Sequence, residues 1–305
     1  RAPGQDAAVT HPMIDASAAR ARLRQRLTTG EVLVAVGVYD GLSTLLAEDA
    51  GFEAVYASGG AIARSAGLPD LGLLTMSEMV ERVRQITQVA SVPVIADADT
   101  GYGSTLNVRR TIRLYEDAGV AALHLEDQVT PKRCGHYEGQ EVIPSEEMVG
   151  KIRAALEARR DPALVIIART DARAAVGLEE ALRRAQLYAQ AGADVLFVEA
   201  PRTREEVRAI REAVRVPLLY NLTYSGKSPL LSPAELRALG YQIVIFPADL
   251  QLGAIRGMQQ VLESLRREGL TPEALRASFQ ERDAVVRLAD WLALAERYGG
   301  RTGSR

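Results

Sequence analysis

Short apolar segments alternate with longer amphipathic segments along most of the chain. Eight of the apolar segments are rich in Val, Ile, Leu and Ala and have the length of strands. Continuous apolar runs of this kind are typical of parallel strands that are buried on both faces of a sheet. They occupy residues 32–40, 54–59, 92–99, 122–127, 164–171, 195–200, 216–222 and 242–247.

The segments between these runs have the spacing of apolar residues that is typical of amphipathic helices. Several end in Ala-Gly directly before the next apolar run, as expected for a helix that stops and turns into a strand. Two of them begin with paired glutamates, which the positive end of a helix dipole favours. The predicted helices are residues 75–90, 105–119, 144–159, 177–192 and 203–214.

This alternation predicts a (β/α)8 TIM barrel, an α/β fold in which each of eight parallel strands is followed by a helix. A doubly wound open sheet is the alternative, but the first predicted βα loop lacks the G-x-G-x-x-G of dinucleotide-binding sheets. Residues 16–28 are predicted to form an extra helix. Residues 271–298 add about two helices beyond the repeats, and because these apolar helices, with Trp291 and Leu292, need a surface against which to bury, we expect an oligomer contact. We expect residues 1–15 to be disordered or extended and residues 16–305 to form one domain.

Composition excludes several classes of protein. A formal net charge of -2 gives no electrostatic reason to expect a nucleic acid or an anionic membrane as partner. No apolar run approaches the roughly 20 residues that a membrane-spanning helix needs. The chain has one cysteine, so an intrachain disulfide is excluded, and a cytoplasmic location is expected.

Polar or ionisable residues close nearly every predicted strand. In a barrel, catalytic groups lie at the carboxyl ends of the strands and in the loops that follow them. One such residue could be a solvated strand end, but a whole rim of them predicts an active site. The residues are Asp40, Ser58, Gly59, Gly60, Asp97, Asp99, Glu126, Arg169, Asp171, Glu199 and Asn221.

The segment Asp97-Ala-Asp99 predicts a metal site. Two positions apart on a strand, both carboxylates would point to the same face, where they repel one another unless a cation or proton intervenes. A small number of oxygen ligands favours Mg²⁺. Glu126, and Asp70 in the loop "GLPDLG", could supply outer-sphere carboxylates. The alternative is that one aspartate only caps the next helix.

Two further rim features are open to two interpretations each. The Ser-Gly-Gly at residues 58–60 offers backbone N–H groups to a substrate carboxylate, or is only a tight turn. Arg169 ends an apolar strand, and its fork suits bidentate binding of a carboxylate. The alternative is a structural salt bridge between Arg169 and Glu199 or Asp171.

Cys134, the only cysteine, lies in the polar segment "HLEDQVTPKRCGH". Neighbouring positive charge from Lys132, Arg133 and His136 lowers the pKa of a thiol and makes it a competent proton donor. Gly135 allows a sharp turn that presents the thiol on a loop. A lone cysteine is more often a small buried apolar residue, but these charged flanks favour a functional role.

Together these motifs resemble the isocitrate lyase / phosphoenolpyruvate mutase superfamily. They are "SGG…GLPDLG", "DADTGYG", "HLEDQVTPKRCGH", "ARTDA", "FVEAP" and "YNLTYSGKSPLLSP", in order from about residue 30 to 265. The branch with 2-methylisocitrate lyase, 2,3-dimethylmalate lyase and carboxyphosphonoenolpyruvate mutase is the most similar. The K-R-C-G-H word is specific for the superfamily but is shared by its lyases and the carboxy-mutase.

The resemblance implies a cytoplasmic homotetramer, a dimer of dimers whose last barrel helix is swapped between subunits. It implies Mg²⁺, or Mn²⁺ in its place, near Asp97 and Asp99, with Asp70 and Glu126 acting through water. It also implies a set of residues that bind the carboxylate substrate. These are Ser58, Gly59, Gly60, His124, Gly135, His136, Arg169, Glu199 and Asn221.

The implied reaction is retro-aldol cleavage of a 2-hydroxy di- or tricarboxylate to an α-keto acid such as pyruvate. Tyr56 is the candidate base, and Cys134, helped by Lys132 and His136, is the candidate acid. The word "FVEAP" differs from the "FPEA" of methylisocitrate lyases and favours a smaller alkylmalate. The alternatives are a phosphonomutase, an oxaloacetate-type decarboxylase, and a barrel that binds a keto acid without turning it over.

Overall fold

The computed structural model describes residues 15–135, 137–224 and 226–299. The chain forms two compact units, one that extends to Leu252 and one that begins at Gly253. The first unit holds all eight strands. That residues 16–305 form one domain stays a prediction.

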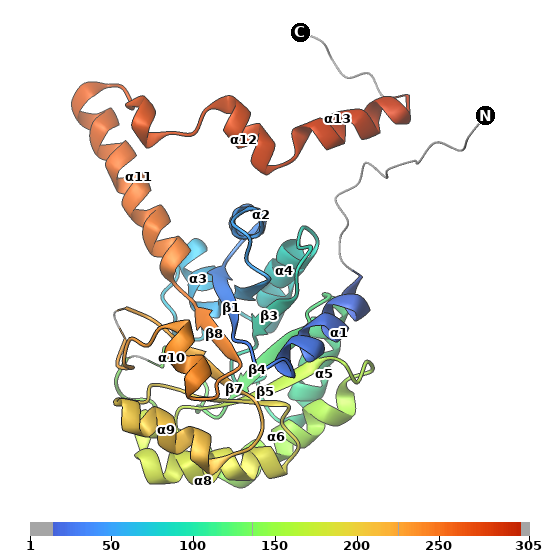
Figure 1. Cartoon of the computed structure of the whole chain (residues 1–305), viewed down its shortest axis with the longest axis vertical. Helices are drawn as coiled ribbons and strands as arrows, with labels where there is room; N and C mark the ends of the chain where they lie inside the picture. The colour runs from blue at the N-terminus through green and yellow to red at the C-terminus, as the bar shows by residue number, and fades with distance from the viewer. Residues whose placement is uncertain (1–14, 136, 225, 300–305) are drawn as a thin grey trace. The chain divides into compact units, whose positions relative to one another are not determined.

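The strands form one closed parallel barrel in the order β1 to β8, which confirms the predicted (β/α)8 architecture (Figure 1). Closure is direct, because Leu33 to Val36 of β1 pair with Ile243 to Phe246 of β8. The strands are β1 (Leu33–Val38), β2 (Ala54–Ala57), β3 (Val94–Asp97), β4 (Ala122–Glu126), β5 (Val165–Thr170), β6 (Val195–Val198), β7 (Leu218–Asn221) and β8 (Ile243–Phe246).

Helices surround the strands of the first unit (Figure 1). Thr75 and Glu78 form a capping box at the start of the helix predicted at residues 75–90, and the two predicted pairs of glutamates lie in the first turns of their helices. The helices are α1 (Ala16–Leu27), α2 (Gly41–Asp49), α3 (Gly59–Ser65), α4 (Met76–Thr87), α5 (Thr105–Asp117), α6 (Ser145–Ala158), α7 (Ala172–Ala175), α8 (Leu178–Gln190), α9 (Arg204–Ala213) and α10 (Pro233–Ala238).

Helix α1, the predicted extra helix, packs at the amino-terminal end of the barrel. Its Leu23 is fully buried in the same apolar cluster as the inward-facing strand residues. Arg20 donates to the carbonyl oxygen of Val120, just before β4, and Arg24 donates to that of Leu164, just before β5. Because α1 covers this end, the opposite end of the barrel is the one available for a site.

The second unit contains most of α11 (Asp249–Glu268), a short 3-10 helix (Glu273–Leu275), α12 (Phe279–Val285) and α13 (Leu288–Arg297). The predicted C-terminal helices are therefore confirmed. Large apolar side chains of this unit are exposed, among them Phe279 and Trp291. Among the described residues, no helix combines the length and the apolar character that crossing a bilayer requires. The cytoplasmic location and the helix swap stay predictions.

Candidate active site

Strand pairing places ionisable side chains beside one another at the carboxyl end of the barrel. Asp97 of β3 is in register with His124 of β4, and Glu126 of β4 is in register with Arg169 of β5. All four side chains are buried, with exposed fractions between 0% and 7%. The rim that the sequence predicted is thus a concentrated set of charges with little access to water.

Asp97, His124 and Glu126 each direct one possible ligand atom toward a common point, and these atoms lie within 4.8 Å of one another. Tyr56 joins them, because its Oη is 2.8 Å from His124 Nε2 and 3.5 Å from Asp97 Oδ2. Burial lowers the pKa of His124 to about 4, so the imidazole is neutral at pH 7. Burial and the nearby Asp97 raise the pKa of Tyr56 well above its ordinary value, so the phenol keeps its proton.

Glu126 has the properties expected of a cation ligand. Among the described residues, neither of its carboxylate oxygens accepts a hydrogen bond, although Arg169 Nη1 lies 3.3 Å away. Burial raises the pKa of Glu126 well above its usual range, and Arg169 offsets this only in part. Next to it, His124 and Lys132 outweigh burial and lower the pKa of Asp97 to about 2. An ionised Asp97 and an under-coordinated Glu126 side by side fit a divalent cation.

Lys132 occupies the space between the other two carboxylates that the sequence assigned to metal. Its Nζ donates to Asp70 Oδ1 at 2.6 Å and lies 2.9 Å from Asp99 Oδ1. These partners raise the pKa of Lys132 well above its usual value against the effect of burial. The structure therefore brings Asp70, Asp99 and Lys132 together, with Lys132 as the cation that they share.

Asp97 and Asp99 do not alternate along one strand, so the predicted shared strand face is wrong. Strand β3 ends at Asp97, and Asp99 follows with a left-handed backbone, φ 46°. The alternation of strand side chains therefore does not apply to Asp99, and the two carboxylates approach each other through a turn. The backbone N–H of Asp99 donates to Asp97 Oδ1 at 3.0 Å, which fixes this turn.

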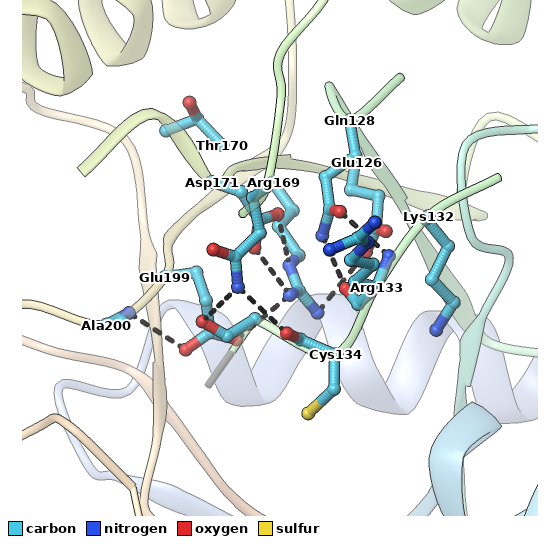
Figure 2. A network of polar contacts seen from close by, with 12 residues as sticks. Glu126, Gln128, Lys132, Arg133, Cys134, Arg169, Thr170, Asp171, Glu199 and Ala200 are labelled. Carbon is cyan, nitrogen blue, oxygen red and sulfur yellow. Dashed lines mark hydrogen bonds and ion pairs between the residues drawn. The ribbon is translucent and has the colours of Figure 1, made fainter. Parts of the chain in front are cut away.

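Arg169 is the centre of a buried ionic network (Figure 2). Its Nε and Nη2 donate to the two oxygens of Asp171 at 2.9 and 2.8 Å, and Nη2 lies 3.2 Å from Glu199 Oε2. The predicted salt bridges to Asp171 and Glu199 are both present. Because Asp171 occupies the Nε and Nη2 edge, a substrate carboxylate would have to use the Nη1 edge, which faces Glu126.

Glu199 and Asn221 extend this network to β7. Asn221 Nδ2 donates to Glu199 Oε2 at 3.1 Å, and the backbone N–H of Ala200 donates to Oε1 at 2.8 Å. Ala200 adopts a left-handed φ of 54° to make this contact. Strained non-glycine residues of this kind cluster at functional sites, where the surrounding structure holds them in place.

The Ser-Gly-Gly segment forms the start of a helix rather than a free turn. Ser58 caps α3, since its Oγ accepts from the N–H of Ala61. Gly59 and Gly60 allow close approach, because a Cβ at Gly59 would collide with the Asp97 carboxylate and one at Gly60 would lie 2.8 Å from Asp70 Oδ2. These glycines therefore bring α3 against the acidic cluster.

The thiol is close to the ionic network. Cys134 is partly buried, and Figure 2 shows its sulfur directed away from the Arg169 guanidinium. Gly135 is buried against Arg169 and Glu199. The roles predicted for His136 concern a position outside the described residues.

Replacing Gly135 by alanine is expected to lower turnover about a hundredfold without unfolding the protein. A Cβ there would lie 2.5 Å from Arg169 Nη2 and 2.5 Å from Glu199 Cγ, so the arginine or the thiol-bearing backbone must shift. Displacements of about 1 Å in an active site reduce rates by about this factor. Steady-state kinetics and circular dichroism check the prediction. Gly253→Ala, where nothing lies within 4 Å, is the matched control and should keep full activity.

The sequence did not single out Asp127, which joins the network through the backbone of Asp171. Its Oδ2 accepts from Tyr188 Oη, Thr170 Oγ1 and Arg184 Nη1, and its Oδ1 accepts from the backbone N–H of Asp171. Asp127 thus holds the residue that orients Arg169. Its position beside Glu126 in "HLED" was the one available signal, but the donors come from distant β5 and α8.

Comparisons with known proteins agree with this arrangement. The model of the phosphoenolpyruvate phosphomutase family matches residues 23–266. The chain is 47% identical over 252 residues to a 2,3-dimethylmalate lyase from Eubacterium barkeri, a match that covers 82% of this chain and 87% of the relative. It is 44% identical over 295 residues to a 2-methylisocitrate lyase from Aeropyrum pernix, covering 92% of this chain and 95% of the relative.

Solved structures resemble the whole barrel. A crystal structure of 2,3-dimethylmalate lyase superposes with a TM-score of 0.89 at 38% identity, covering 96% of this chain and 100% of that one. A phosphonopyruvate hydrolase in complex with oxalate and Mg²⁺ superposes with a TM-score of 0.84 at 34% identity, covering 92% and 98%. A structural relative thus binds Mg²⁺.

Proposed function

The chain belongs to the phosphoenolpyruvate phosphomutase family, and we propose that it is a Mg²⁺-dependent carbon–carbon lyase. It would cleave a 2-hydroxy di- or tricarboxylate into an α-keto acid and a second carboxylate. The observation that supports this most directly is the rim itself. The carboxylates of Asp97 and Glu126, which can bind a cation, lie near Arg169. The loop that follows β4 carries the thiol of Cys134. These groups can bind an anionic substrate and deliver a proton to a carbanion.

Asp97 and Glu126 would hold the Mg²⁺, with Asp70 and Asp99 contributing through water from the Lys132 side. When bound, Mg²⁺, or Mn²⁺ in its place, supplies a Lewis acid that polarises the substrate oxygens and lowers the pKa of the hydroxyl. The raised pKa of Glu126 supports this assignment, because a cation beside the carboxylate would offset the cost that burial imposes on its charged form.

Mg²⁺ is expected to bind more weakly at pH 5 than at pH 7, by a factor of about ten or more. Burial and the charge of Asp97 raise the pKa of Asp99 to about 6, although Lys132 opposes them, and the site must be deprotonated to bind a cation. For the stability of the metal-free protein the sign is opposite. A raised folded pKa contributes stability that is present below the unfolded value and is lost as the pH rises through about 6. Isothermal titration calorimetry measures the affinity, and equal dissociation constants at the two pH values would contradict the assignment.

We assign the remaining rim residues to substrate binding, proton removal and proton delivery. We propose that Arg169, Glu199, Asn221, Gly135 and His136 surround one carboxylate end, and Ser58, Gly59, Gly60 and His124 the other. Tyr56 takes the hydroxyl proton as its own phenol proton passes to the neutral His124 Nε2, 2.8 Å away, and the C–C bond breaks so that its electron pair moves onto the departing carboxylate fragment. The Cys134 thiol then protonates that carbon, helped by the positive charge of Lys132 and by His136.

We propose an alkylmalate rather than a tricarboxylate as the substrate. The support is local: the segment "FVEAP" contains Val198 where the tricarboxylate lyases carry a proline. The chain is also similar to both a dimethylmalate lyase and a methylisocitrate lyase. Substrate class therefore has to be measured.

A substrate panel tests the proposal. Citramalate, 2,3-dimethylmalate and 2-methylisocitrate are each incubated with enzyme and Mg²⁺, and released keto acid is measured. A lyase releases keto acid from at least one substrate, and EDTA abolishes the release. Phosphorus NMR with a phosphoenolpyruvate-type substrate tests the mutase alternative, and carbon dioxide release from oxaloacetate tests the decarboxylase alternative. Binding of oxalate with no turnover in any assay would leave only a keto-acid-binding barrel.

We further propose a homotetramer in which the C-terminal helices pack on neighbouring subunits. Exposed apolar side chains on these helices support this assembly. They are Met258, Leu262, Phe279, Trp291 and Leu292. Sedimentation equilibrium of the full chain measures the state, and a monomer at micromolar concentration would refute it.

A further inference from the structure

We propose that two buried glutamines, Gln128 and Gln140, are positioning residues that hold the thiol of Cys134 at the rim. The role of the thiol as acid rests on the proposed function, but its placement by the two glutamines does not. Neither glutamine touches the carboxylates of the rim in any contact of the described residues. Both act through the backbone on either side of Cys134.

The segment that carries the thiol leaves and returns to β4 through a short antiparallel ladder. Gln128 and Val142 form an isolated bridge, and the N–H of Val129 donates to the carbonyl oxygen of Glu141 at 2.8 Å. The N–H of Ile143 donates to the carbonyl oxygen of Asp127 at 2.9 Å. This ladder fixes both ends of the segment to the strand that supplies Glu126, and it places one glutamine on each arm.

Gln128, on the outgoing arm, pairs with the backbone of Arg133 (Figure 2). Its Nε2 donates to the Arg133 carbonyl oxygen at 2.8 Å, and the Arg133 N–H donates back to Oε1 at 3.0 Å. The side-chain amide therefore makes with Arg133 the two hydrogen bonds that the backbone of a neighbouring strand would make. Gln128 is only 1% exposed, so water cannot readily substitute for it.

Gln140, on the returning arm, lies inside the turn that follows the thiol. Its Nε2 lies 2.9, 3.0 and 2.8 Å from the carbonyl oxygens of Cys134, Gly135 and Tyr137. Three acceptors that converge on one buried group require a donor there. A neutral amide shares its two N–H groups among them, whereas a carboxylate would repel them and an apolar side chain would leave buried acceptors unpaired.

The two glutamines together fix the peptide groups directly before and after the Cys134 side chain. Gln128 satisfies the carbonyl that precedes Cys134, and Gln140 satisfies the carbonyl of Cys134 itself. The backbone that carries the sulfur is therefore held by two side chains of the ladder. Rigid placement of an acid matters because proton transfer is sensitive to small displacements.

Because Cys134 is the only thiol, its alkylation by iodoacetamide reports on this segment without any substrate. We expect Gln140→Met and Gln140→Glu to raise the alkylation rate about tenfold, the factor that corresponds to losing one to two hydrogen bonds. Gln128→Met should act in the same direction. Gln25→Glu, an exposed position on α1, adds the same charge as Gln140→Glu and should react within twofold of wild type.

A second readout separates positioning from a general loss of structure. If the lyase activity is established, Gln140→Met should lower kcat about tenfold while KM and the Mg²⁺ dissociation constant stay at wild-type values. Wild-type alkylation rates in both Gln140→Met and Gln128→Met would overturn the proposal, whatever the substrate panel shows. If the variants fail to fold, hydrogen exchange of the wild-type chain decides. Slow exchange of the Arg133 amide supports the proposal, and exchange at the rate of an unstructured peptide overturns it.

Discussion

Cys134→Ser is expected to lower kcat about 10²- to 10⁴-fold with little change in KM. A serine hydroxyl has nearly the shape of the thiol but is a far weaker acid, so the variant loses proton delivery to the carbanion. An acid that acts only in the transition state affects kcat and kcat/KM together. The loss is measured as the rate of keto-acid release from the substrate that the panel identifies.

Two controls define this result. Cys134→Ala should lose as much activity as Cys134→Ser, because both lack an acidic proton. Mg²⁺ affinity and thermal stability should match the wild type in both variants, since Asp97 and Glu126 are unchanged. Turnover of Cys134→Ser within twofold of wild type would remove the thiol from the mechanism.

Arg169→Met is expected to reduce the free energy of unfolding by about 3–5 kcal/mol at pH 7. The guanidinium is the shared partner of Glu126, Asp171 and Glu199, all of them buried. Removing one partner of a buried ionic network leaves a buried charge without compensation. The resulting loss of stability is larger than the net stabilisation that the intact network provides. Chemical denaturation followed by circular dichroism measures the change.

The pH dependence of this variant identifies the cause. Without Arg169, the pKa values of Glu126 and Asp171, which burial already raises, rise further in the folded state, and groups with a raised folded pKa destabilise the fold as the pH increases. The deficit should therefore be smaller at pH 5 than at pH 8. Arg84→Met is the matched control, because Arg84 pairs with Glu81 at the surface and its loss should change stability by less than about 1 kcal/mol. A deficit of that small size for Arg169→Met would contradict the role of the network.

The sequence was sufficient to predict the barrel, since apolar runs of strand length and Ala-Gly helix ends report local preferences. It was also sufficient to predict the rim, because Asp97, Glu126 and Arg169 each break an apolar run at the strand end. Parallel pairing then makes these strand ends neighbours without further information.

The pairing of long side chains could not be predicted in the same way. Lys132 reaches Asp70 across 62 positions of the sequence, and this contact depends on how two loops fold over one another. The contact of Asp171 with Arg169 could not be chosen from the sequence either. Asp171 accepts hydrogen bonds from the Nε and Nη2 edge of Arg169, which the sequence also allowed a substrate carboxylate to use. Gln140 had no signal at all, because a glutamine among loop residues is ordinarily solvated.

The pairing of the first strand with the last has a consequence for synthesis on the ribosome. The edge of β1 that receives β8 stays unpaired until residues 243–246 have been made, more than two hundred positions after β1 itself. At typical elongation rates of about 5–20 residues per second, that interval lasts roughly 10 to 40 seconds. During it, the apolar strand Leu33–Val38 presents an open edge to other nascent chains. Slower translation would lengthen this interval, and cells that make the protein rapidly or keep chaperones at the exit tunnel would shorten or cover it.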